Sequence, residues 1–301
     1  MPADSPSGGG VARHLLRGMR PRQWIKNLLV VLAPAAAGEA FHLGIALRTG
    51  VAFIALCLAA SGTYLLNDIR DVEADRLHPQ KRSRPVASGS LPIGVAAVAA
   101  VVLLAAGIGI GAALEWRLGL VVALYVAETV SYSFGVKNIP VIELGFVAAG
   151  FVLRAIAGGV ATNLPLSSWF LVVISFGALF VVVGKRLAEF HHLGEDAGSH
   201  RQVLTTYTET FLDSALVLCA GVTVTAYCLW ALDADDNLNL VRHSQIWIEL
   251  SVIPVVLGVL YVLLQLSAGR GGAPEDLVLK DRTVQSLGVA LAICVAIGVY
   301  G

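Results

Sequence analysis

The sequence LRTGVAFIALCLAASGTYLLN, residues 47–67, runs directly into DIRDVEADRLHPQKRSRPVASG, residues 68–89. The first part is almost wholly apolar and is long enough for an α-helix to cross about 30 Å of hydrocarbon. The second part is dense in Asp, Arg and Lys, so it belongs in water or at a polar site. This order is typical of a helix that leaves a bilayer, and it predicts an integral membrane protein with charged groups at one membrane surface.

The composition extends this interpretation to the whole chain. Of its 301 residues, 56% are hydrophobic and 14% are charged, whereas about 25% of residues are charged in soluble domains. The formal net charge is zero, so the overall charge favours no nucleic-acid partner. The four cysteines lie in apolar stretches without metal-ligand or disulfide spacing, and we interpret them as small core residues.

Apolar runs of spanning length recur along the chain. We predict an all-α integral membrane protein with nine transmembrane helices, because backbone groups in lipid must bond within helices or a closed barrel. Residues 1–18 are predicted to form a disordered, basic tail, and 19–301 a single transmembrane domain. The predicted spans are 25–38 (extended to about 43), 47–67, 92–114, 118–135, 141–161, 167–184, 211–232, 246–266 and 284–300.

The basic residues are distributed unequally between the two sets of loops. Most of the 21 Lys and Arg fall on the side of the N-terminus, whereas Arg48, Arg117 and Arg242 fall on the other side. Because basic loops stay cytoplasmic during insertion, we predict a cytoplasmic N-terminus. An odd number of spans then places the C-terminus outside.

Three carboxylates align where the second predicted span ends. Asp68, Asp71 and Asp75 fall within about 60° of one another on a helix, with Asn67 one step to the side and Glu73 about 140° from Asp68. Aligned like charges repel unless a cation compensates them, and Mg²⁺ prefers hard oxygen ligands shared with substrate phosphates. We therefore predict that the three aspartates and Asn67 bind Mg²⁺. A solvated acidic turn neutralised by nearby basic residues is the alternative.

The residues after this acidic turn are basic. Lys81, Arg82 and Arg84 suit the diphosphate oxygens that magnesium leaves free, and Asn67 joins them in a predicted diphosphate-binding set. Each of these basic residues could instead simply keep its loop on the cytoplasmic side of the membrane.

Two further loops on the same predicted side supply polar groups to this set. Lys185, Arg186 and Glu189 follow the sixth span and lie close together on a helix, either at a phosphate site or in a surface ion pair. Tyr132 and Lys137 lie between the fourth and fifth spans. Lys137 either binds phosphate or anchors a short loop.

A second phosphate site is predicted at the first span. Arg20, Arg22, Lys26 and Asn27 stand where the chain enters the membrane, which suits a lipid phosphate headgroup or simple anchoring. Arg154 lies within the fifth span. An intramembrane charge is costly, so Arg154 needs either a ligand or a structural partner on another helix.

The motif NDIRDVEAD, residues 67–75, at the end of the second of nine predicted spans, resembles the first aspartate-rich motif of the UbiA superfamily of intramembrane prenyltransferases. The resemblance implies a UbiA-like helical bundle over 19–301, with Mg²⁺-dependent catalysis by Asp68, Asp71 and Asp75. Those relatives usually carry a second aspartate motif after the sixth span, where this chain reads GKRLAEF, residues 184–190. This departure puts ordinary prenyl-diphosphate binding in doubt and suggests direct cationic contact with a phosphate.

Further motifs resemble one branch of this superfamily, the decaprenyl-phosphate phosphoribosyltransferases. Membership implies transfer of 5-phosphoribose from phosphoribosyl pyrophosphate to decaprenyl phosphate or a related polyprenyl phosphate. The diphosphate-binding set would hold the donor, and the residues at the first span, with Arg154, would hold the acceptor. The motifs are 67–89, RPRQWIKN (20–27), LRAIAGGVAT (153–162), SSWFL (167–171), VVGKRLAE (182–189) and PEDLVLKDR (274–282).

The same resemblance implies a place in the cell. The product of that family is the precursor of the arabinose donor for actinobacterial arabinogalactan and lipoarabinomannan, so we expect a bacterial plasma membrane and a site that faces the cytoplasm. A UbiA-type transferase that attaches a polyprenyl chain to an aromatic or glycerol phosphate acceptor is the alternative enzyme. A transporter or lipid-phosphate flippase also tolerates intramembrane charge. Whether the chain forms a homo-oligomer is left open.

Overall fold

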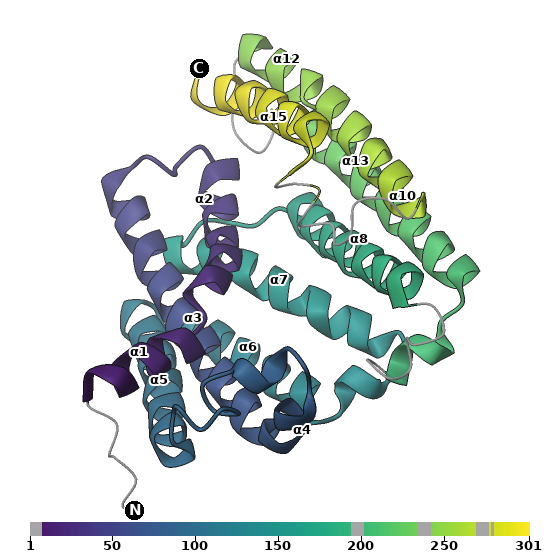
Figure 1. Ribbon diagram of the computed structural model, residues 1–301. Helices are drawn as coiled ribbons and strands as arrows, with labels where there is room; N and C mark the ends of the chain where they lie inside the picture. Colours follow the sequence, from purple (N-terminus) through teal and green to yellow (C-terminus); the bar gives the residue numbers. More distant parts are fainter. Residues whose placement is uncertain (1–7, 194–201, 234–241, 269–276, 278–279) are drawn as a thin grey trace, which may run out of the picture. The chain divides into compact units, whose positions relative to one another are not determined.

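The computed structural model describes residues 8–193, 202–233, 242–268, 277 and 280–301 (Figure 1). Within these ranges the regular elements are α-helices and 3₁₀ helices, which confirms the all-α class. The chain divides into two compact units. Unit 1 comprises Met1–Pro34, Phe41–Ser133 and Leu153–Leu164, and unit 2 comprises Ala35–Ala40, Phe134–Val152 and Pro165–Gly301.

Unit 1 is packed around one long apolar helix, α3. Its buried face is rich in small residues such as Ala52, Ala55 and Ala59, which let neighbouring helices approach closely. A Cβ on Gly107 of α5 would lie 2.7 Å from the carbonyl oxygen of Ala55, so this glycine sets the closeness of α3 and α5. The elements that begin in this unit are α1 (Gly8–Gly18), η1 (Pro21–Val31), α2 (Leu32–Ala36), α3 (Leu43–Arg70), α4 (Val72–Leu77), η2 (Lys81–Ser83), α5 (Ile93–Leu114) and α6 (Trp116–Phe134).

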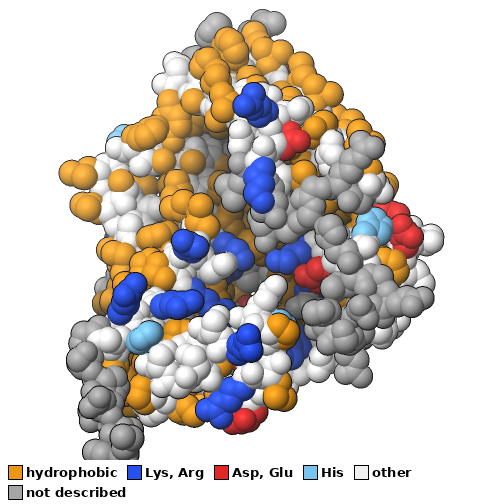
Figure 2. Space-filling view, viewed as in Figure 1, with side chains coloured by type: hydrophobic (Ala, Val, Ile, Leu, Met, Phe, Trp, Pro, Cys, Tyr) orange, Lys and Arg blue, Asp and Glu red, His pale blue; other side chains and the backbone are white. Residues whose placement is uncertain are grey.

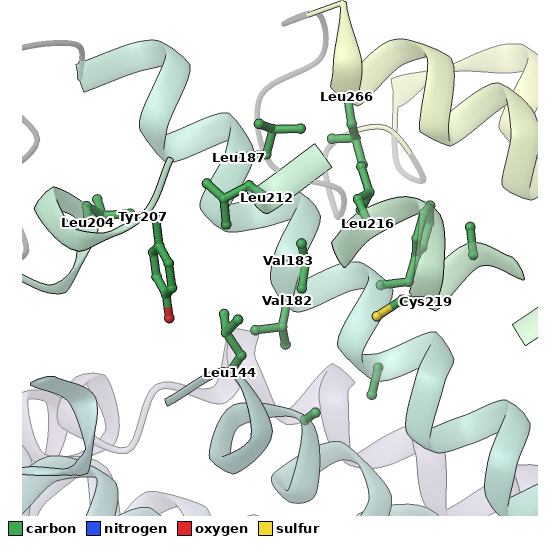
Figure 3. Packing of buried hydrophobic residues seen from close by; sticks show 14 of the residues in the cluster. Leu144, Val182, Val183, Leu187, Leu204, Tyr207, Leu212, Leu216, Cys219 and Leu266 are labelled. Carbon is green, nitrogen blue, oxygen red and sulfur yellow. The ribbon is translucent and has the colours of Figure 1, made fainter. Parts of the chain in front are cut away.

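Unit 2 has its own hydrophobic core. Figure 3 shows Val183 and Leu187 of α8 close to Leu212 and Leu216 of α10, with Leu144 of α7 in the same cluster. Burial of such side chains contributes about 1.5–3 kcal/mol each. The elements that begin in this unit are η3 (Val136–Asn138), α7 (Ile142–Thr162), α8 (Ser168–Leu193), η5 (Gln202–Thr206), α10 (Glu209–Leu232), α12 (Arg242–Leu250), α13 (Val252–Ser267) and α15 (Arg282–Tyr300).

Seven helices of the described residues are long and apolar enough to cross a membrane, so the predicted count of nine is not confirmed. The first predicted span forms the 11-residue 3₁₀ helix η1 followed by the five-residue α2, and neither reaches spanning length alone. The fourth forms α6, where Arg117, Glu128 and several hydroxyl residues lower the hydropathy. Helix α5 exposes Val98 by 66% and Val101 by 64%, as expected for a surface that faces lipid.

The segment predicted to be a tail contains helix α1. Val11 and Leu15 of α1 pack against a cluster that includes Leu65 of α3 and Leu91. Helix α1 is therefore packed against the C-terminal part of α3, just before Asp68. The rest of the predicted tail, residues 1–7, lies outside the described residues.

Candidate active site

The aspartates of the NDIRDVEAD motif lie where α3 gives way to α4. Helix α3 ends at Arg70, and Asp71 caps it with φ −90° and ψ 10° before α4 begins at Val72. The uninterrupted helix assumed by the spacing argument is therefore broken at Asp71. Even so, Asp68 and Asp75 are both buried, at 1% and 3% exposure.

Two arginines bond these aspartates, and one of them, Arg84, joins Asp68 to Asp75. Arg84 donates from Nη1 to Oδ2 of Asp75 at 2.6 Å and to Oδ1 of Asp68 at 3.3 Å. Arg20 also donates to Oδ1 of Asp68 and lies over the Tyr64 ring, 5.0 Å from its centroid. The side chains of both arginines remain about a quarter exposed. We call Asp68, Asp75, Arg20 and Arg84 the aspartate–arginine cluster.

One oxygen of this cluster has no hydrogen-bond partner among the described residues. Oδ2 of Asp68 is buried and accepts no hydrogen bond within the described part of the chain. A buried carboxylate oxygen without a donor is costly unless a cation or water satisfies it. The cluster is thus suited to a hard divalent cation, although the structure brings no group of three His, Cys, Asp or Glu to metal-binding distance among the described residues.

The remaining residues of this predicted metal and diphosphate site lie between Asn67 and Arg82, on the segment that also carries Asp68 and Asp75. Asp71 is a quarter exposed and pairs with Arg70 at 3.3 Å. Asn67 lies half-buried on the last turn of α3, and Lys81 and Arg82 are exposed on η2. Glu73 is 80% exposed and bonds Arg76, so it points away from Asp68, as the helical spacing predicted.

The residues predicted to bind a lipid phosphate do not form one open group. Arg154 is buried and donates to Oδ1 of Asn27 at 2.8 Å and to the hydroxyl of Tyr125 at 2.9 Å. Asn27 in turn donates to Sγ of Cys57. Arg154 therefore has structural partners from other helices of unit 1, which was one of the two predicted alternatives.

The other members of this predicted lipid-phosphate group lie along the start of η1. Arg20 belongs to the aspartate–arginine cluster, Arg22 is exposed, and Lys26 is half-buried. Trp24, between them, donates from its indole to the hydroxyl of Ser61 on α3 at 3.1 Å.

In unit 2 a buried ion pair joins α7 to α8. Arg186 donates from Nε and Nη2 to the two carboxylate oxygens of Glu143, at 2.7 and 2.8 Å, and from Nη1 to Glu189 at 2.9 Å. Glu143 is fully buried, and the side chain of Arg186 is 4% exposed. Carboxylates thus accept hydrogen bonds from all three nitrogens of the Arg186 guanidinium. The side chain of Glu189, which this bond orients, is 30% exposed.

Tyr207 completes this group beside the start of α10. Its hydroxyl accepts the backbone N–H of Val141 at 2.8 Å and lies 3.5 Å from Oε1 of Glu143. Burial raises the pKa of Tyr207 above its ordinary value, so the phenol stays protonated at neutral pH. Lys185 is half-buried on α8 next to Arg186.

The other two predicted donor-binding residues lie at the end of α6 and on η3. Tyr132 is half-buried near the end of α6 in unit 1, and Lys137 is half-buried on η3 in unit 2. Their predicted role in donor binding stays a prediction.

A sequence model of the UbiA prenyltransferase family matches residues 28–278. The match includes the aspartate motif, η2 and the Arg186 region. This chain belongs to the UbiA prenyltransferase family. The observed fold agrees, because a UbiA homolog from Archaeoglobus fulgidus bound to GPP and Mg²⁺ superposes with a TM-score of 0.67 at 19% identity, over 95% of this chain and 98% of that one.

Two relatives within the UbiA family are similar over nearly the whole chain. A decaprenyl-phosphate phosphoribosyltransferase of Corynebacterium glutamicum is 40% identical and covers 96% of this chain and 88% of its own length. A protein of the same name from Mycolicibacterium smegmatis is 41% identical over 95% of this chain and 92% of its own.

The sequence argument overlooked several polar residues of this UbiA chain. Glu143 lies within the fifth predicted span and was assigned no role from the sequence, whereas the structure pairs it with Arg186. A carboxylate inside a predicted span was itself the signal, because such a group is rarely left without a partner. No sequence spacing could have indicated Tyr125, Tyr64 or Tyr207, whose partners lie far away in the chain.

Proposed function

We propose that this UbiA-family enzyme transfers 5-phosphoribose from phosphoribosyl pyrophosphate to decaprenyl phosphate or a related polyprenyl phosphate, with release of pyrophosphate. The observation that carries the proposal is 40–41% identity, over at least 95% of the chain, to two proteins named for this activity. The aspartate–arginine cluster supports it, because a diphosphate donor requires both anionic metal ligands and cationic partners at one place.

The donor diphosphate and Mg²⁺ belong, in this proposal, at the end of α3. Asp68 and Asp75 would hold the ion, with Asp71 and Asn67 beside them. Oδ2 of Asp68 accepts no hydrogen bond from the described residues, which suits a hard cation. When bound, Mg²⁺ supplies charge stabilisation to the departing pyrophosphate. Arg20 and Arg84 keep positive charge next to the same carboxylates, and the exposed Lys81 and Arg82 extend it toward solvent.

The acceptor needs positioning more than activation. A phosphate monoester has a second pKa of about 6, so it is largely dianionic at neutral pH and needs no strong general base. Arg22 and Lys26 of η1 are the proposed contacts for this phosphate. The Arg154–Asn27 bond fixes η1 against α7 within unit 1, so we assign Arg154 to holding this element in place.

Three further residues keep the phosphate-binding role that the sequence pattern predicts. They are Lys185 and Lys137 of unit 2 and Tyr132 of unit 1. Arg186 is better suited to positioning, because a phosphate would have to displace two carboxylates that already occupy its guanidinium. It holds Glu189 at the surface of α8.

The proposed setting is a bacterial plasma membrane. The basic loops and the aspartate–arginine cluster would face the cytoplasm, which supplies a phosphorylated sugar donor, and the polyprenyl chain would lie in the bilayer. The N-terminus would be inside and the C-terminus outside.

The test is a reconstituted assay with purified full-length protein, Mg²⁺ and decaprenyl phosphate. Phosphoribosyl pyrophosphate should yield pyrophosphate and a lipid-linked phosphoribose, and free polyprenol should be inert because it lacks the nucleophilic phosphate. A parallel reaction offers a polyprenyl diphosphate with 4-hydroxybenzoate or glycerol phosphate. Prenylation there, without ribose transfer, would support the alternative UbiA-type activity and overturn this proposal.

A further inference from the structure

Helix α1 carries a cationic hollow that the proposed reaction does not use. A hollow of about 560 Å³ is lined by Gly10, Arg13, His14, Leu16 and Arg17 of α1 together with Pro21 of η1. In Figure 2, Lys and Arg side chains gather at the lower left, where Figure 1 draws α1.

The basic side chains of this hollow have no anionic partner in the described structure. Arg13 and Arg17 are exposed, and no hydrogen bond or ion pair joins the side chain of Arg13, His14 or Arg17 to any described residue. Arg20 and Arg84, by contrast, are neutralised by Asp68 and Asp75. The α1 cations thus remain available to a bound anion.

The spacing of these residues puts the cations on one side of α1. Arg13 and Arg17 are four residues apart and lie about 40° from each other, whereas Val11 and Leu15 lie roughly on the opposite side. Val11 and Leu15 pack against the cluster that contains Leu65 and Leu91, so the attached face is the apolar one. Like charges four residues apart destabilise a helix, and an anion between Arg13 and Arg17 would remove that penalty.

The surroundings favour a lipid over a soluble anion. Helix α1 stops at Gly18 and is followed by η1, where the chain enters the predicted first span. Leu16, on the rim of the hollow, is 53% exposed, so an apolar side chain stands beside the cations. A phosphate headgroup with an attached acyl region matches this combination of two arginines, a histidine and an exposed leucine.

We propose that the outer face of α1 binds the phosphate of an anionic membrane phospholipid, through Arg13 and Arg17 with His14 beside them. This lipid is distinct from both substrates of the proposed reaction. Its binding holds α1 against the end of α3. Arg20 follows α1 closely in the chain and bonds Asp68. The bound lipid therefore also restrains the segment that joins α1 to the aspartate–arginine cluster.

The test compares hydrogen exchange of full-length protein in nanodiscs of phosphatidylcholine and in nanodiscs that also contain phosphatidylglycerol. Each basic residue near an anionic surface strengthens binding about fivefold, so we expect the backbone amides of α1 to exchange on the order of 25-fold more slowly with phosphatidylglycerol present. Arg13→Gln/Arg17→Gln should abolish this difference, and either single substitution should reduce it. Arg117→Gln removes an exposed charge near the start of α6 and should leave it intact.

Three results would each overturn the proposal. They are equal exchange of α1 in the two lipids, a lipid difference that survives in Arg13→Gln/Arg17→Gln, and full protection by inorganic phosphate or phosphoribosyl pyrophosphate in phosphatidylcholine alone. Exchange of α3 amides in phosphatidylcholine reports whether the double variant folds, and it should match the parent. None of these measurements depends on catalytic activity, so they stand apart from the proposed reaction.

Discussion

Asp68 meets different surroundings at its two carboxylate oxygens. Oδ1 faces Arg20 and Arg84, whereas Oδ2 is buried without a donor among the described residues. Asp68→Asn keeps the size of the side chain but removes its charge. We expect turnover, measured as pyrophosphate release with phosphoribosyl pyrophosphate and decaprenyl phosphate, to fall about 100-fold or more.

Glu73 provides the matched control for Asp68, since it lies on the next element but is 80% exposed and pairs with Arg76. Glu73→Gln should stay within about twofold of the parent, because exposed pairs contribute roughly 0–1 kcal/mol. Equal losses in the two variants would contradict the assignment of Asp68.

The Glu143–Arg186 pair makes a different prediction, about stability. Removing one partner of a buried pair leaves an uncompensated charge and costs about 3–5 kcal/mol, whereas replacing both with apolar residues is often neutral. Glu143→Gln and Arg186→Gln should each lower the melting temperature in detergent, and Glu143→Leu/Arg186→Met should recover most of the loss. A double variant no more stable than the single variants would show that the pair is needed for more than its charge balance.

At the scale of elements, one glycine sets how closely η1 packs on α7 within unit 1. A Cβ on Gly158 would lie 2.0 Å from the carbonyl oxygen of Val30, a backbone atom that has little room to move. Gly158→Ala should therefore displace η1, lower the melting temperature by several degrees and reduce turnover, because Arg20 precedes this helix. Both quantities are measured on the same detergent-purified protein.

Gly145 is the control on the same helix, because a Cβ there meets nothing within 4 Å. Gly145→Ala should leave activity unchanged and raise stability by up to about 1 kcal/mol, since alanine favours a helix over glycine. If Gly158→Ala behaved in the same way, the close approach of η1 and α7 would not matter to the fold.

The α3–α4 junction shows how far helical spacing can predict a site. Hydropathy located α3 within a few residues, and the spacing correctly separated Glu73 from Asp68. The spacing also assumed that the helix continued through Asp71, whereas the chain breaks there and Arg84 gathers Asp68 and Asp75. Arg84 lies beyond α4, so helical spacing could not indicate its contacts with Asp68 and Asp75.

At the scale of the whole molecule, the sequence predicted membrane helices well and polar partners poorly. Apolar length alone determines whether a segment can span a bilayer, so most spans could be recognised without knowledge of their neighbours. The partners of Arg154 and Arg186 are Asn27 and Glu143, far away in the chain, and only folding brings them together. The first and fourth predicted spans are the exceptions. The first is divided between the short helices η1 and α2, and polar residues lower the hydropathy of α6.

The topology of the entire chain can be tested with single cysteines in a background lacking Cys57, Cys219, Cys228 and Cys294. Lys81 on η2 and Arg117 at the start of α6 are both exposed and lie at opposite ends of α5. Since basic loops stay cytoplasmic, a membrane-impermeant maleimide should label Lys81→Cys only in inside-out vesicles and Arg117→Cys only in right-side-out vesicles. Gly301→Cys decides the number of crossings that follow Lys81: the seven predicted spans from α5 to α15 place it with Arg117→Cys, because α6 then crosses the bilayer. Labelling of Gly301→Cys together with Lys81→Cys would mean an even number of crossings between these two positions, and the weakly apolar α6 would have to lie at the interface instead.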